Sequence, residues 1–176
     1  MAGREVARVV NRCNEAKENE NKILDLSQCE MTQIPDAVYF LMNHTEIESC
    51  ILAQNLLKRI PAKFITNFPC LKELYINSNH LGTLPDEMLQ FEVLETLDIS
   101  QNEFTTLPSV VYKMGSLKTL NAEKNLITEV DIKELKNLPN ILELNFQENP
   151  LLPSMLSELK CFPENIKVFL TVGPNV

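Results

Sequence analysis

The stretch that decides the fold is Leu71-Lys-Glu-Leu74-Tyr-Ile76-Asn-Ser-Asn79-His-Leu81-Gly-Thr-Leu84-Pro85. Its frame recurs along the chain, and each copy places an asparagine or a cysteine at the same point: Cys29, Asn55, Asn79, Asn102, Asn125 and Asn149. These positions are 26, 24, 23, 23 and 24 residues apart. A nearly constant period of this length is typical of a solenoid, in which each coil stacks on its neighbours.

The alternation of apolar residues explains the repeat physically. Leu74 and Ile76 lie two positions apart, so in a strand both point to one face while Tyr75 points to the other. One coil cannot bury its apolar face alone, but stacked coils form a continuous core. Asn79 comes where the strand turns away, and its amide can bond backbone groups of its own coil and of the adjacent one. The recurring side chains are therefore expected to form a buried ladder.

The pattern resembles the leucine-rich repeat family, in particular its intracellular subclass of about 23 residues per repeat with Leu-Pro after the asparagine. The resemblance covers residues 21–151 and is most specific at Leu84-Pro85 and Leu107-Pro108. It departs at Cys29 and at Val130-Asp131, which replaces Leu-Pro. It implies a right-handed α/β solenoid of six repeats, with a parallel concave sheet, short helical or irregular convex segments and a cap at each end.

The ends of the chain differ from the repeats. We expect one structural domain, with an N-terminal capping helix in residues 1–22, six repeats in residues 23–151 and a C-terminal cap in residues 152–176. Residues 2–18 have helical spacing, and their apolar stripe is expected to pack on repeat one through Val6, Val9 or Val10, and Cys13. The alternative is a basic amphipathic helix that lies on a membrane.

Two further segments carry expectations about structure. The stretch from Pro35 to Ile47 suggests a fuller convex helix, with some side chains facing inward in part: Val38, Phe40, Leu41 and Met42. Near the C-terminus, residues 166–172 alternate as in a strand and are expected to form a last rung that closes the core.

Composition limits the function and the compartment. The chain of 176 residues has a formal net charge of −8, which argues against nucleic-acid binding because that needs a positive surface. It lacks an apolar run long enough for a membrane span and an apolar signal core. The five cysteines, an odd number without a CxxC pair, indicate free thiols in the cytoplasm or nucleus. The sequon at residues 43–45 is then a chance match.

No motif for catalysis, a cofactor or a metal is recognisable. His44 and His80 are the two histidines, and neither has cysteines at ligand spacing. Phosphate-binding loops and hydrolase motifs are missing from the sequence. Cys70 and a histidine could form a nucleophile pair only if coils distant in sequence met in space. We therefore expect no enzyme, cofactor or metal.

The outward strand positions form the candidate site. They are expected to line a polar concave face with acids but no Lys or Arg in six strands, which suits an unidentified protein partner with a basic surface. A solvated face without a function is the alternative for the same residues, and a regulatory or structural subunit that binds through its convex side or ends is the alternative function. A monomer is expected. The candidate partner-binding residues are Asp25, Ile51, Glu73, Tyr75, Asp98, Asn121, Glu123, Glu143 and Asn145.

Overall fold

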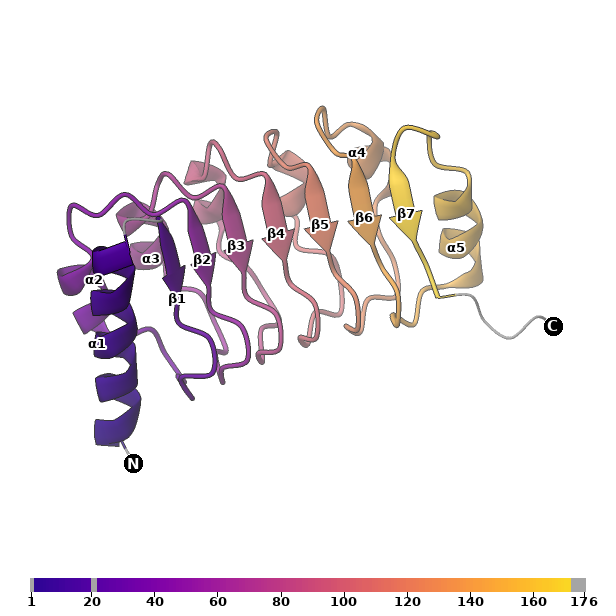
Figure 1. Ribbon diagram of the computed structural model, residues 1–176. Helices are drawn as coiled ribbons and strands as arrows, with labels where there is room; N and C mark the ends of the chain where they lie inside the picture. The colour runs from indigo at the N-terminus through magenta and orange to yellow at the C-terminus, as the bar shows by residue number, and fades with distance from the viewer. Residues whose placement is uncertain (1, 20–21, 172–176) are drawn as a thin grey trace.

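A computed structural model of the chain describes residues 2–19 and 22–171, and all strands among them belong to one parallel sheet in the order of the sequence (Figure 1). The predicted solenoid fold is confirmed. Each strand is short, and the next strand follows after one return segment. The strands are β1 (Ile23–Asp25), β2 (Ser49–Ile51), β3 (Glu73–Tyr75), β4 (Thr96–Asp98), β5 (Thr119–Asn121), β6 (Glu143–Asn145) and β7 (Lys167–Phe169).

The return segments form the convex side. Three of them begin directly after a proline, at Pro35, Pro61 and Pro85, and a fourth begins at Pro153, whose missing N–H is not needed in the first turn of a helix. In two coils the segment is a 3₁₀ helix rather than an α-helix. The elements are α1 (Ala2–Asn19), which precedes the sheet, and then α2 (Asp36–Leu41), α3 (Ala62–Asn67), η1 (Asp86–Gln90), η2 (Val111–Lys113), α4 (Ile132–Lys136) and α5 (Pro153–Lys160).

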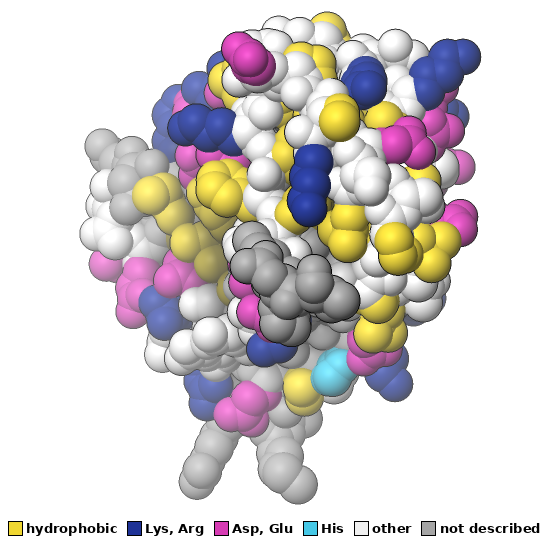
Figure 2. All heavy atoms as spheres, turned by 90° about the vertical axis from the view of Figure 1, so that its right-hand side faces the viewer, with side chains coloured by type: hydrophobic (Ala, Val, Ile, Leu, Met, Phe, Trp, Pro, Cys, Tyr) yellow, Lys and Arg dark blue, Asp and Glu magenta, His cyan; other side chains and the backbone are white. Residues whose placement is uncertain are grey.

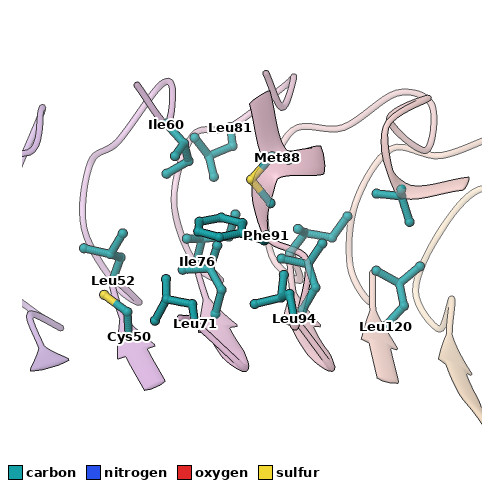
Figure 3. Close-up of a cluster of buried hydrophobic side chains, with 14 of the residues drawn as sticks. Cys50, Leu52, Ile60, Leu71, Ile76, Leu81, Met88, Phe91, Leu94 and Leu120 are labelled. Carbon is teal, nitrogen blue, oxygen red and sulfur yellow. The ribbon is translucent and has the colours of Figure 1, made fainter. Parts of the chain in front are cut away.

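The core lies between the sheet and the convex segments. The strand residues expected to face inward, such as Leu74 and Ile76, are fully buried, and their counterparts stand in register in the neighbouring strands. Convex residues such as Met88 and Phe91 close the layer from the other side (Figure 3). Phe64 packs edge-on to Phe91, with their ring centroids 6.5 Å apart. Stacking thus buries an apolar face that no single coil could cover.

The asparagines form a ladder that runs past the C-terminal ends of the strands, from one coil to the next. In Asn79 the side-chain Oδ1 accepts the N–H of Leu57 in the preceding coil at 3.0 Å. Its Nδ2 donates to the carbonyl of Leu52 in that coil at 3.0 Å and to two carbonyls of its own coil. Asn102 and Asn125 repeat the arrangement, and all three are at most 8% exposed. Each amide therefore joins two coils.

The two ends of the ladder differ from its middle. In the described part of the chain no strand precedes the coil of Cys29, and the thiol of Cys29 donates a hydrogen bond to the carbonyl of Ser27 at 3.4 Å. Burial raises the pKa of the Cys29 thiol, which keeps it neutral. Asn149 makes the same bonds as the other asparagines but is only half-buried. A cysteine in place of asparagine at position 29 therefore removes no ladder hydrogen bond on the N-terminal side of its coil.

Helix α1 covers the N-terminal end of the sheet. Val9 and Cys13 are fully buried and Ala16 nearly so, which leaves the membrane alternative without its apolar stripe. The expectation that Val6 packs on the first repeat is wrong, because this side chain is 43% exposed. Figure 1 shows the reason, since the first turns of α1 project beyond the coils. Arg8 instead anchors this part by donating to the carbonyl of Gln28 at 2.6 Å.

The convex helix after Pro35 has one exposed aromatic ring. In α2, Val38 and Met42 are buried and Leu41 is partly buried, as expected. Phe40 was expected to face inward in part, and this is wrong, because its side chain is 83% exposed. The short helix turns one face to the core, and Phe40 lies on the other.

The C-terminal end is more open than the N-terminal end. The inward residues of β7 and its flanks, Ile166, Val168 and Leu170, are only partly buried, whereas their counterparts in earlier strands are fully covered. Leu152 and Phe169 are about two-fifths exposed, at 41% and 42%. Figure 2 looks onto this end and shows apolar side chains scattered over it among charged ones. Helix α1 covers the first strand, while β7 has one neighbour among the described strands, β6.

Candidate protein-binding face

The outward side chains of the strands form the face that we call the concave face. Strand register places them in rows that cross the sheet. The first row is Ile23, Ser49, Glu73, Thr96, Thr119, Glu143 and Lys167, and the middle row is Asp25, Ile51, Tyr75, Asp98, Asn121, Asn145 and Phe169. Eight of the nine sequence-predicted site residues stand in these two rows, and the ninth, Glu123, lies two residues after β5 and accepts a hydrogen bond from Asn145 of the middle row. We count Glu123 as part of the concave face, and the binding role of all nine stays a prediction.

Four residues of the middle row also hold the backbone. Asp98 accepts the N–H of Ser100 at 2.8 Å, two positions further on. Asp25, Asn121 and Asn145 accept the equivalent N–H groups at 2.9–3.1 Å. Asp and Asn can both form this local bond. The carboxylate charge of Asp98 is therefore not needed for it, because neighbouring coils achieve the same bond with a neutral amide.

The carboxylates in β3–β6 and just after β5 have neutral partners. Glu73 accepts bonds from the hydroxyls of Ser49 at 2.9 Å and Tyr75 at 3.4 Å. Asn121 donates to Asp98, and Asn145 donates to Glu123, each at 3.1 Å. Within the described residues none of these three carboxylates, nor Glu143, forms an ion pair. This part of the face carries negative charge that no ion pair within residues 2–19 and 22–171 neutralises.

The residues just before the strands show the opposite behaviour. Lys22 and Lys72 both bind the carboxylate of Glu48 at 2.6 Å, and Lys118 binds Glu95 at 2.8 Å. The two lysines, acting as hydrogen-bond donors, lower the pKa of Glu48 to about 2. The residues just before the strands thus form a row of alternating charges that pair with one another across neighbouring coils. Sequence reasoning missed this row, although Lys and Glu alternate in the same place of successive repeats.

Tyr75 is the aromatic centre of the concave face. Its ring is half-buried between Ile51 and Asp98, its neighbours in the middle row. Partial burial and the nearby carboxylate of Glu73 raise the pKa of Tyr75, so the hydroxyl stays protonated at neutral pH. The side chain combines apolar area with a hydroxyl that can hydrogen-bond, which are properties found at interface anchors.

A hollow opens where α1 meets the concave face. It has a volume of about 240 Å³ and is lined by Arg12, Glu15, Ala16, Asn19, Ile23, Asp25 and Ile51. The guanidinium of Arg12 lies 3.6 Å from the carboxylate of Asp25 at its margin. Ile23 is 39% exposed. Sequence reasoning missed the contribution of α1, because an apolar stripe predicts that a helix packs but does not indicate which polar side chains it brings beside the sheet.

The far end of the concave face has a different character. Lys167 and Phe169 extend the two rows onto β7, opposite Glu143 and Asn145. Sequence reasoning predicted this strand but did not assign its outward residues to the site. The alternation of residues 166–172 was a sufficient signal for doing so. A basic and an aromatic side chain thus end a face that is acidic in its middle.

The histidines and exposed cysteines lie outside this face. Cys70 and His44 come from neighbouring coils and line one hollow together with Glu46 and Phe68. In residues 2–19 and 22–171 no group of three His, Cys, Asp or Glu side chains is arranged to hold a metal ion. Nor does any helix in these ranges combine the length and apolarity that crossing a membrane requires.

Comparisons with known proteins agree with this geometry. The sequence profile of the leucine rich repeat family matches residues 45–104 and 69–127. The chain is a leucine-rich repeat protein. It resembles leucine-rich repeat-containing protein 20 of Homo sapiens and of Mus musculus, with 36% identity over 88 residues in each case. This match spans 49% of the chain and 48% of each relative, so it covers about half of their length.

Solved structures with this repeat share the fold. The leucine-rich repeat protein LIC12759 of Leptospira interrogans superposes with a TM-score of 0.68 at 24% identity, over 79% of this chain and 34% of that one. An internalin of Listeria monocytogenes, inlF, superposes with a TM-score of 0.61 at 17% identity, over 81% of this chain and 39% of that one. At these identities the likeness concerns the fold alone. Leucine-rich repeats are typical of protein-interaction modules.

Proposed function

We propose that this protein is a non-catalytic interaction module that binds another protein on its concave face. The observation that carries the proposal is the half-buried aromatic Tyr75 beside carboxylates that accept hydrogen bonds from neutral donors. A few anchor residues, rather than area alone, give interfaces most of their affinity. A partner with basic groups would supply cations to these carboxylates. Its rate of association should fall as salt is added, because salt screens the attraction between exposed charges.

The test compares two faces of one protein against a partner captured by crosslinking in cells. Tyr75→Ala should weaken binding by at least about 2 kcal/mol if Tyr75 is an anchor. Glu73→Lys with Glu123→Lys should slow association, while the matched convex pair Glu87→Lys with Glu92→Lys should leave it unchanged. Loss of binding in the convex pair together with normal binding in the concave pair would refute the proposal.

A second candidate function is a regulatory or structural subunit that binds through the convex side. The observation in its favour is Phe40 on α2, whose ring is 83% exposed. A single exposed ring is a smaller surface than the concave face, which is why this function ranks second. Phe40→Ser should abolish partner binding under this alternative and leave it unchanged under the first.

The compartment is part of the proposal. We place the protein in the cytoplasm or the nucleus, because all five of its cysteines are free thiols. Burial raises the pKa of Cys13 to about 11 and also raises that of Cys50, so both behave as packed apolar groups. Fractionation of cells should recover the untagged protein in these compartments, and recovery from the secretory pathway would contradict the placement.

A further inference from the structure

We infer that the concave face takes an extended polypeptide segment with one apolar side chain, followed at two and at four residues by lysine or arginine. The apolar side chain enters the hollow between α1 and the sheet, and the two cations reach Asp98 and Glu123. This inference rests on the proposed function and specifies the chemistry of the partner.

The hollow is suited to the apolar side chain. Its walls include the aliphatic residues Ile23 and Ile51 of the sheet and Ala16 of α1. Its volume of about 240 Å³ has room for one large aliphatic group. Figure 1 shows α1 standing beside β1 at the end of the sheet, so the helix forms one side of the hollow. An apolar group that leaves water here gains free energy in proportion to the area buried.

Charge decides in which direction the segment continues. At the hollow, both carboxylates, Glu15 and Asp25, already have a cation of the chain, because Arg12 pairs with each of them. Across the sheet, past Tyr75, the carboxylates of Asp98 and Glu123 accept hydrogen bonds from amide and backbone donors and form no ion pair within the described residues. A cationic segment anchored at Ile51 therefore runs away from α1 toward β4 and β5.

Strand spacing sets the positions of the cations. Neighbouring strands lie about 4.8 Å apart. Asp98 is two strands from Ile51, which is about 10 Å. Glu123 is three strands from Ile51 and two residues further along the chain direction, which is about 16 Å. An extended peptide advances about 3.3 Å per residue, which brings the second residue to about 7 Å and the fourth to about 13 Å. The remaining distance of roughly 3 Å is within reach of a lysine side chain, and both residues fall on the same face of the segment as the anchor.

The experiment uses the full-length protein and fluorescein-labelled peptides, with binding measured by fluorescence anisotropy. The probe is Gly-Leu-Ser-Lys-Ser-Lys-Gly. The matched peptides replace Leu by Ser, replace both Lys by Gln, or shift both Lys next to Leu. We expect the probe to bind at least tenfold more tightly than each of the three. Equal binding of the Leu and Ser peptides would overturn the inference, because only the charges would then matter.

Variants of the protein locate the site. Ile51→Thr, which keeps a β-branched residue in the strand, should weaken binding of the Leu peptide at least tenfold and leave the Ser peptide unaffected. Asp98→Asn with Glu123→Gln should weaken the probe at least tenfold and flatten its salt dependence, whereas Glu87→Gln with Glu92→Gln should change neither. Unchanged binding in both site variants, with thermal melts showing that they are folded, would overturn the inference.

Two outcomes separate this inference from the proposed function. If a captured partner loses binding with Tyr75→Ala but not with Ile51→Thr, the concave face binds while the hollow does not, and only the present inference fails. A peptide with Leu and Lys at helical spacing that binds more tightly than the extended probe would likewise overturn it, since the partner would then be a helix.

Discussion

The asparagine ladder and the concave face are both rows of polar side chains repeated once per coil, yet they differ in what those side chains bind. Asn102 is 8% exposed, and its amide bonds backbone groups of two coils. Asp98, four residues earlier, is half-exposed, and it forms no ion pair in the part of the chain that the structure describes. Periodicity alone does not separate buried polar residues that join the coils from polar residues that are free to bind a partner; burial and saturation of hydrogen bonds do.

The largest effect on stability is expected within the ladder. Asn102→Ala removes the acceptor of the Leu81 N–H and the donor to the Ile76 carbonyl, both buried, at a cost of roughly 1–3 kcal/mol. Asn149→Ala should cost less, because this half-buried residue lies near the open end. Asn77→Ala, on the outward side, should cost little. Urea unfolding of the three variants measures the order, and an Asn77 variant as unstable as the Asn102 variant would show that the ladder has been assigned wrongly.

A second effect concerns carboxylates that do have cations. The pKa of Glu48 is lowered to about 2 from 4.5 by hydrogen bonds from Lys22 and Lys72. A lowered folded-state pKa stabilises the protein above the unfolded value, and this contribution disappears as pH falls from about 4.5 to about 2. Wild type should therefore melt higher than Glu48→Gln at pH 7, with the gap closing toward pH 2. A gap independent of pH would mean that packing, and not charge, distinguishes the two.

A third variant separates burial from hydrogen bonding. Tyr39 is 7% exposed, and its hydroxyl has no hydrogen-bond partner within the described residues. Burial raises its pKa to about 12. Tyr39→Phe keeps the ring under the Lys63 ammonium, 4.6 Å from the ring centroid, and removes only the unsatisfied hydroxyl. Stability should stay within about 0.5 kcal/mol of wild type or rise. A loss above 1 kcal/mol would indicate that the hydroxyl is bonded and belongs with the ladder residues.

The sequence was sufficient for the fold because the repeat has few physical solutions. Leu74 and Ile76 at strand spacing and Asn79 at the turn predict which residues face inward, which face outward and where the coils are joined. The outward rows followed directly, because register is set by the inward residues. The same alternation would have extended the site to Lys167 and Phe169.

Other parts of the site needed the structure because they depend on contacts between segments. Nothing in the spacing of α1 indicates that Arg12 meets Asp25 or that a hollow forms beside Ile51. The local hydrogen bond that the Ser100 N–H donates to Asp98 depends on the backbone conformation after the strand. That backbone includes Gln101 and Lys124, which hold positive φ angles of 52° and 53° just before the ladder asparagines. Such angles are uncommon for residues other than glycine, so sequence did not predict them.

One measurement tests the distinction between the two rows most directly. The triple variant Glu73→Gln, Asp98→Asn and Glu123→Gln removes three negative charges and leaves one acceptor oxygen in each side chain, so that residue 98 can keep the bond from the Ser100 N–H as Asn121 and Asn145 keep theirs. Because those three charges form no ion pair within the described residues, removing them should not destabilise the fold. Urea unfolding of the triple variant should give a free energy of unfolding equal to or above that of wild type, whereas Asn102→Ala lowers it. Binding of the basic probe should be lost in the triple variant. If the triple variant is destabilised as much as Asn102→Ala, the concave carboxylates hold the fold together and are not a free binding surface.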